Sequence, residues 1–258
     1  MLKEISFVVF FAIFFMGAEL WAHEEDVNGR IDIQLLSSNH FEVGKTTFYF
    51  KLNDKIEKKE ITDKSLNVVH EKLLHLFIFD KGLGEFQHLH PEYKENKWVT
   101  ETSLSKSGDY LIWTQGQLSD DLLDFVSNYA ISVSGGTEAN VVPPVLKDIR
   151  EGDNGVSVVK MTNFRFVKNM VAQPNINFSR KDGTNPSLEN YLGAKAHVVV
   201  TPLGADSLIH THPMDHDVPN QLMLHMTFPE AGFFRLWIQF IDGGQLRVVP
   251  MSVEVFEK

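Results

Sequence analysis

Short apolar runs alternate with clusters of turn-forming residues along the whole chain. The runs are rich in β-branched and aromatic side chains, and Gly, Asn, Asp or Ser separates most of them. This spacing is typical of antiparallel strands in a sandwich or barrel. No segment carries a long 3.6-residue apolar period, so helix should be scarce. The predicted strands are residues 31–36, 46–52, 74–79, 98–104, 110–114 and 129–133, followed by 157–160, 176–178, 196–201, 222–228, 234–240 and 246–255.

The second half of the chain repeats the first. A His is followed thirteen positions later by His-x-His-Pro twice, starting at His75 and again, about 122 residues on, at His197. Residues 108–115 and 232–239 also match, as Gly-x-x-x-x-Trp-x-Gln. Matching order and spacing over some fifty residues indicate an internal duplication. We therefore predict an all-β protein of two tandem antiparallel β-sandwiches.

Composition marks the segment that precedes the first sandwich and the segment that joins the two sandwiches. Residues 1–22 combine Lys3, an apolar run and a terminal Ala22, which is typical of a secretory signal peptide. The run is short for a bilayer, which needs about 20 residues, so we expect contact with the membrane only if the segment stays uncleaved. A Gly-Gly to Pro-Pro stretch near residue 140 indicates a linker. The expected organisation is a signal peptide at 1–22, a first sandwich at 23–137, a linker at 138–150 and a second sandwich at 151–258.

Composition narrows the chemistry. The chain has no Cys, which excludes disulfides and thiolate metal ligands. Its formal net charge of −10 argues against nucleic acid as a partner. No Ser nucleophile elbow, Walker loop or dinucleotide fingerprint is present, so we expect no enzyme activity.

The repeated histidines form two triads. Their members are His75, His88 and His90 in the first copy and His197, His210 and His212 in the second. Within each copy, the two His of His-x-His share one strand face. A hairpin turning at residues 81–84 would pair His75 with His90, and one turning at 203–206 would pair His197 with His212. Three imidazoles would then converge in each copy, a donor set that suits copper or zinc.

Further ligands and a metal-free alternative remain open at this point. Aligning the two copies places Glu101 opposite His225, which makes both candidate fourth ligands. Met214, Met223 and Met226 lie near the second triad in sequence, and thioether ligands favour copper. Cleavage after Ala22 would make His23 the N-terminus, where amine and ring could chelate copper, and a redox enzyme at that site is a third hypothesis. Alternatively, the triads bind no metal and fix the hairpins through hydrogen bonds.

The Trp of each copy points away from the predicted core. Trp113 and Trp237 alternate with core residues and share their strand face with Gln115 and Gln239. A large apolar side chain on that face indicates that it is covered as well, and the other sandwich is the expected cover.

Both copies resemble YtkA-like and related exported bacterial domains. The resemblance is carried by residues 75–92 and the Gly-Asp-Tyr stretch at 108–110 in the first copy. In the second copy it is carried by residues 188–200 and by the segments around His-Thr-His-Pro and Thr-Phe-Pro-Glu-Ala-Gly-Phe-Phe. The resemblance covers most of residues 60–116 and 185–250, and it implies an immunoglobulin-like or cupredoxin-like sandwich with an exported location. We expect a periplasmic or secreted metal-binding protein, for copper or else zinc, that acts as a chaperone, buffer or resistance factor. The alternative is a non-catalytic module that binds an envelope protein and in which the His residues are structural.

Overall fold

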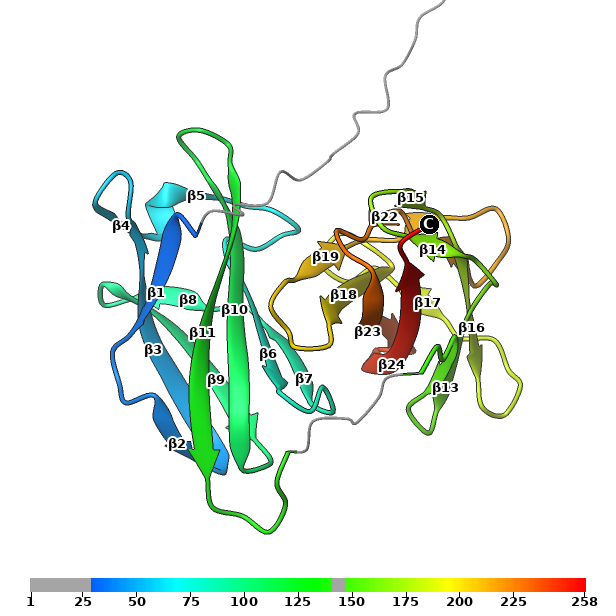
Figure 1. The fold of residues 1–258 in the computed structure, drawn as a ribbon, viewed down its shortest axis with the longest axis horizontal. Coiled ribbons are helices and arrows are strands. Elements are labelled where there is room, and N and C mark those ends of the chain that lie inside the picture. The colour runs from blue at the N-terminus through cyan, green and yellow to red at the C-terminus, as the bar shows by residue number, and fades with distance from the viewer. Residues whose placement is uncertain (1–28, 141–146) are drawn as a thin grey trace, which may run out of the picture.

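The computed structural model describes residues 29–140 and 147–258. The predicted signal peptide and His23 lie outside these residues. The described part of the chain forms two β-sandwiches that pack side by side, the first from β1 to β11 and the second from β12 to β24 (Figure 1). The predicted all-β class and the tandem sandwich arrangement are confirmed.

Each sandwich pairs a five-stranded sheet with a six-stranded one. In the first sandwich, the five-stranded sheet contains β1 (Ile31–Leu35), β3 (Gly44–Asp54), β9 (Lys97–Leu104), β8 (Glu92–Lys94) and β4 (Lys59–Ile61). Its six-stranded sheet contains β2 (His40–Glu42), β11 (Asp124–Ser134), β10 (Gly108–Leu118), β6 (His75–Asp80), β7 (Phe86–Leu89) and β5 (Leu66–Asn67). One short 3-10 helix, Asp63–Ser65, precedes β5.

The second sandwich has the same plan. Its five-stranded sheet contains β12 (Glu151–Asp153), β13 (Ser157–Met161), β16 (Asn175–Arg180), β21 (Gln221–Met223) and β20 (Met214–Asp215). Its six-stranded sheet contains β14 (Phe166–Val167), β24 (Gln245–Phe256), β23 (Gly232–Asp242), β18 (Ala196–Pro202), β19 (Ile209–Thr211) and β17 (Leu188–Glu189). A small separate sheet joins β15 (Val171–Ala172) to β22 (Met226–Thr227).

The duplication is visible in the pairing of the six-stranded sheets. Their orders are β2-β11-β10-β6-β7 and β14-β24-β23-β18-β19, and in both the first strand is parallel to its neighbour while the other pairs are antiparallel. Both hairpins also have the predicted register, with Phe77 opposite His88 and Val199 opposite His210. Residues 81–85 and 203–208 connect the paired strands, and a slip of one residue would move every side chain to the other face.

A separate hydrophobic core fills each sandwich. In the first, the Tyr110 hydroxyl lies at the start of β10, where it donates to the carboxylate of Glu85 (2.8 Å) and accepts from the backbone N–H of Lys106 (3.2 Å). A Tyr that bonds back to the chain a few residues upstream is a feature of immunoglobulin-like sandwiches. The second sandwich has Phe234 at this position, which is fully buried and has no hydroxyl.

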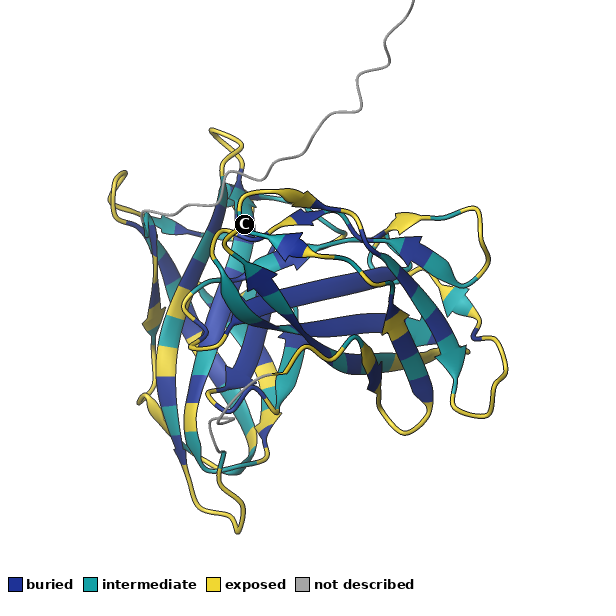
Figure 2. Ribbon diagram, turned by 45° about the vertical axis from the view of Figure 1, so that its right-hand side comes forward, coloured by how far each residue is buried: buried dark blue, intermediate teal, exposed yellow. Residues whose placement is uncertain are grey.

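The six-stranded sheets are buried on both faces. Every residue of β6 and of β18 is buried, and Figure 2 shows this buried band where the sandwiches meet. A third hydrophobic cluster fills this interface; its buried members are Phe77, Phe79, Leu83, Trp113, Val199, Ala205, Leu208 and Trp237. The prediction that the other sandwich covers the Trp face is therefore confirmed.

One predicted strand is interrupted. Residues 222–228 form two short strands in different sheets, because β21 pairs with β16 while β22 pairs with β15. The chain changes sheets at Leu224 and His225, where the Leu224 N–H donates to the Pro174 carbonyl (2.9 Å). Within residues 29–140 and 147–258, no helix is long and apolar enough to cross a membrane.

Candidate metal centre

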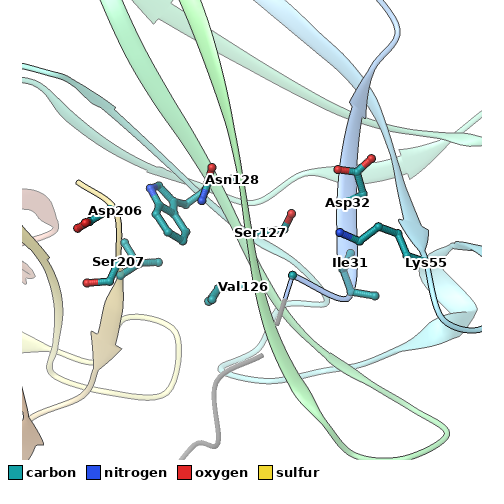
Figure 3. Close-up of a pocket in the computed structure, with 11 residues that line it drawn as sticks. Ile31, Asp32, Lys55, Val126, Ser127, Asn128, Asp206 and Ser207 are labelled. Carbon is teal, nitrogen blue, oxygen red and sulfur yellow. The ribbon is translucent and has the colours of Figure 1, made fainter. Parts of the chain in front are cut away.

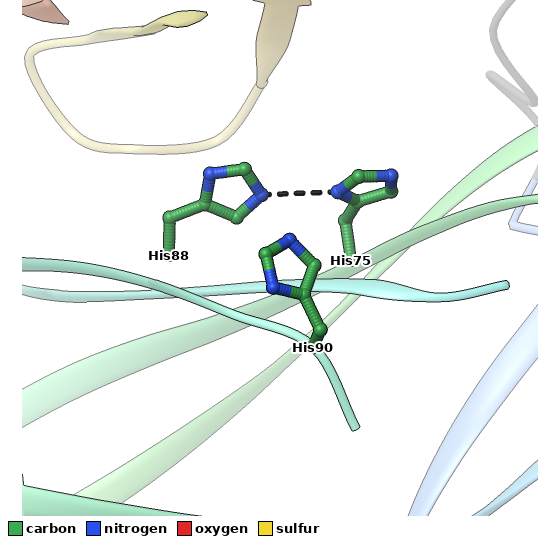
Figure 4. Close-up of side chains that lie close together, drawn as sticks. All are labelled: His75, His88 and His90. Carbon is green, nitrogen blue, oxygen red and sulfur yellow. Dashed lines mark hydrogen bonds between the residues drawn. The ribbon is translucent and has the colours of Figure 1, made fainter. Parts of the chain in front are cut away.

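The β6–β7 hairpin brings the first triad together. His75 begins β6, His88 lies on β7 and His90 follows it, and Figure 4 shows the three rings facing one point. Each offers one nitrogen within 4.8 Å of the others. His75 and His88 are only 2% and 7% exposed, so water cannot satisfy their ring nitrogens freely.

The hydrogen bonds of the first triad bring two ring nitrogens within hydrogen-bonding distance of each other (Figure 4). The Nε2–H of His75 donates to the carbonyl oxygen of Val69 (3.1 Å), and the Nδ1–H of His88 donates to Oε1 of Gln239 (2.8 Å). A neutral His75 uses its one N–H at Val69, so its Nδ1 carries a lone pair, whereas His88 Nε2 carries a lone pair when Gln239 presents its oxygen and a proton when Gln239 presents its amide nitrogen. These two nitrogens, His75 Nδ1 and His88 Nε2, are 3.0 Å apart.

The second triad repeats this arrangement bond for bond. The Nε2–H of His197 donates to the Tyr191 carbonyl (2.8 Å), and the Nδ1–H of His210 donates to Oε1 of Gln115 (2.9 Å). The remaining nitrogens, His197 Nδ1 and His210 Nε2, are 3.2 Å apart. Two nitrogens on one tetrahedral ion, each about 2.0–2.1 Å from it, lie about 3.3 Å apart. Both pairs are close to that spacing.

The third imidazole differs between the triads: His90 joins His75 and His88 in one group of potential ligands, whereas the other group among the described residues contains His88, His197 and His210 but not His212. Nε2 of His212 lies 2.7 Å from His197 Nδ1. Nε2 of His90 is buried and has no hydrogen-bond partner among the described residues. A buried polar atom that lacks a partner is costly unless something else binds it, and a metal ion would do so at this point.

Burial favours the uncharged form of five of the six triad rings. It lowers the pKa of His75 to about 4 and that of His90 to about 3. It also lowers the pKa of His197, and it holds the pKa values of His88 and His210 well below the ordinary value for histidine, with the neighbouring imidazoles adding to the effect. The neutral ring binds a metal through its unprotonated nitrogen, and an N–H on the other nitrogen that donates to an oxygen is the usual arrangement around metal-ligating histidines.

The triads meet across the interface. The ring centroids of His88 and His210 are 5.2 Å apart, and the donor atoms of His88, His197 and His210 form a second group within 4.8 Å. His70 also takes part, since its ring centroid lies 3.7 Å from that of His212 in the other sandwich. Sequence reasoning missed His70. The repeat gives no signal for it, because Leu192 occupies the matching position of the second copy.

The predicted fourth ligands are not part of this cluster. Glu101 is exposed on β9, in the five-stranded sheet of the other layer. His225 uses its backbone carbonyl to accept from the Thr211 hydroxyl (3.2 Å), and its ring belongs to neither group of potential ligands found in the described residues. The methionines give copper no added support either, because Met226 is buried in the second core and Met214 is exposed on β20.

A separate cleft lies between the sandwiches. Asp206 and Ser207 of the β18–β19 turn line one side and Ile31 of β1 lines the other, with residues 126–128 of β11 between them (Figure 3). Neither of the two groups of potential metal ligands in the described chain lies there. The histidine cluster is therefore the candidate site.

These features define a tandem β-sandwich protein with a histidine cluster at the inter-domain interface. The chain belongs to the family described as "Domain of unknown function (DUF8832)", which matches residues 26–133 and again residues 153–257. The two matches agree with the duplication. No curated protein matches the chain.

The solved structures that match the chain are distant from it in sequence and have low TM-scores. One is FdeC, an adhesin of Escherichia coli, at 13% identity over 88% of this chain and 64% of that chain, with a TM-score of 0.28. A second contains fibronectin(III)-like modules of CbhA from Clostridium thermocellum, at 13% identity over 88% and 94%, with a TM-score of 0.24. A third is invasin, a bacterial integrin-binding protein, at 10% identity over 87% and 39%, with a TM-score of 0.27. The chain thus spans less than two thirds of the adhesin and invasin chains.

Proposed function

We propose that this protein is an exported metal-binding protein that holds copper in its histidine triads and acts as a copper chaperone, buffer or resistance factor. The observation that carries the proposal is the close approach of two ring nitrogens in each triad, at 3.0 Å in the first and 3.2 Å in the second, beside a buried His90 Nε2 that has no hydrogen-bond partner among the described residues. With the glutamine oxygens turned to the histidines, both nitrogens of each pair carry lone pairs, and a cation between them would form a bond to each.

Copper is the first choice among the metals that imidazole binds. For a given set of nitrogen ligands, divalent copper binds more tightly than zinc, nickel or cobalt. Zinc is the alternative, since its tetrahedral sites use the same ligands at similar distances. Three protein ligands leave a further position open, which allows an ion to be passed on by ligand exchange.

The location is part of the proposal. A signal peptide at residues 1–22 and the resemblance of both copies to YtkA-like domains support export to the periplasm or the outside of the cell.

The metal-free alternative follows from one feature of the same contacts. If the amides of Gln115 and Gln239 were turned by half a circle, each would donate an N–H to a histidine Nδ1, and that histidine would donate in turn to His75 or His197. Such a network needs no ion, and the protein would then be an interaction module with structural histidines.

Titration calorimetry of the purified protein at pH 7 decides between them. We expect Cu²⁺ to bind with micromolar or tighter affinity, and we expect His210→Ala with His212→Ala to abolish the second-triad share of that binding. As a matched control, His225→Ala with His216→Ala removes two histidines outside the cluster and should leave binding unchanged. Failure of both Cu²⁺ and Zn²⁺ to bind the intact protein would refute the proposal in favour of structural histidines.

A further inference from the structure

The two triads lie against each other and not at separate places on the molecule. The His88 ring centroid is 5.3 Å from that of His75 in its own triad, and 5.2 Å and 5.8 Å from those of His210 and His197 in the other. Spacing across the interface is therefore the same as spacing within a triad. Ions bound to the two triads would be close neighbours.

Each triad is oriented by the opposite sandwich. Gln239, on β23 of the second sandwich, accepts from His88 of the first, and Gln115, on β10 of the first, accepts from His210 of the second. Gln239 is 2% exposed. Within its own sheet, Gln239 is paired with His197 and Gln115 with His75, so each glutamine stands beside one triad and bonds to the other.

The first sandwich also reaches the second triad with a ring. His70 follows Val69, whose carbonyl accepts from His75, and its ring lies edge-on to His212 with the planes at 86°. Leu192 replaces it in the second copy, so the cluster has seven imidazoles, four from the first sandwich and three from the second.

We propose that the two triads form a single two-ion centre at the interface, in which each sandwich binds its own ion and orients a ligand of the other ion through a glutamine. This inference rests on the proposed metal binding. Gln115 and Gln239 are positioning residues, because they act on the ion through His210 and His88. Metal affinity of each triad then depends on the docking of both sandwiches.

Crossed glutamine variants test the proposal. In His210→Ala/His212→Ala protein, where only the first triad remains, Gln239→Leu should weaken Cu²⁺ binding about 10- to 100-fold, as loss of such an orienting bond typically does. Gln115→Leu should have no effect in that background. In His75→Ala/His90→Ala protein, where only the second triad remains, the two results should be exchanged.

Two further measurements separate positioning from stability. Gln239→Glu keeps an oxygen acceptor and should restore the affinity that Gln239→Leu loses, while thermal melts of the metal-free variants report any loss of docking. The intact protein should bind two Cu²⁺, and its electron paramagnetic resonance spectrum should show coupling that neither single-triad background shows.

The outcomes are distinguishable. If each glutamine affects only the triad beside it in its own sheet, or if the spectrum of the loaded protein equals the sum of the single-triad spectra, the two-ion centre is wrong although metal binding stands. If the intact protein binds neither ion, the proposed function itself fails.

Discussion

Asp242 illustrates how one buried carboxylate stabilises the second sandwich. It is 4% exposed at the end of β23, and it accepts from Arg180 Nε (2.9 Å) and Nη2 (2.7 Å) and from the backbone N–H of Ser187 (2.9 Å). The hydrogen bonds from Arg180 are the main cause that lowers the pKa of this carboxyl, against the effect of burial. The pair joins β16 to the six-stranded sheet and so holds the two layers of the sandwich together.

We predict that Asp242→Asn lowers the free energy of unfolding at pH 7 by about 1.5–3 kcal/mol, the usual range for hydrogen bonds to a charged group. Arg180 would keep its charge and lose its partner. Urea denaturation followed by circular dichroism measures the change. Asp217→Asn, at an exposed carboxylate of the same sandwich, is the matched control and should stay within about 0.5 kcal/mol of the parent.

The same residue gives a prediction for pH. Because the folded-state pKa of Asp242 is lowered, its contribution is present above the unfolded value of about 3.9 and is lost as pH falls through the folded pKa. The stability difference between the parent and Asp242→Asn should therefore be constant between pH 5 and 7 and should shrink below pH 4. Denaturation curves across that range check the sign, and a difference that grows on acidification would contradict it.

At the scale of elements, the hairpins show what a sequence can determine. The register of β6 with β7 follows from the short connection at residues 81–85, so the convergence of His75, His88 and His90 was predictable. The second copy gave an independent example with the same spacing.

Other parts of the site could not be predicted in this way. Aligning the copies placed Glu101 opposite His225, but proximity between strands depends on which sheet each joins, and β9 joins the layer away from the triads. His70 approaches His212 only because the sandwiches dock, and docking depends on long-range packing that no local pattern records. The Trp face indicated a cover, but the sequence did not show that the triads would lie opposite each other.

The hydroxyl of Tyr110 holds the connection between the two layers of the first sandwich, and a substitution there tests its contribution to stability. Replacement by Phe keeps the buried ring and removes the hydroxyl that bonds to Glu85 and Lys106, at an expected cost of about 1–2 kcal/mol. Thermal or urea denaturation measures it. Tyr49→Phe, at a residue that is 39% exposed, serves as the control and should change stability little. An equal loss in both variants would mean that the corner bonds contribute nothing.

At the scale of the whole molecule, the interface is an apolar surface with a polar cluster inside it. Trp237 of the second sandwich stacks on Phe79 and Phe86 of the first, with centroids 5.5 Å and 4.7 Å apart and planes at 17° and 11°. Arg235 Nε donates to the Leu83 carbonyl beside this stack (3.2 Å). The apolar contacts exclude water, and this exclusion keeps the imidazoles neutral.

Trp237→Ala should therefore separate the behaviour of the two sandwiches. Its side chain is on the outer face of β23, so the core residues Leu236 and Ile238 on the inner face stay in place. Removing a buried Trp costs about 3–5 kcal/mol, and here the docked state bears most of that cost. Calorimetry of the metal-free protein should show two unfolding transitions in the variant where the parent shows one. Leu246→Ala, at an exposed position of β24, should leave the single transition intact.

Because docking positions the glutamines, the Trp237→Ala variant should also bind Cu²⁺ more weakly although it retains all seven imidazoles. An unchanged single transition together with unchanged affinity would show that the Trp stack does not hold the sandwiches together.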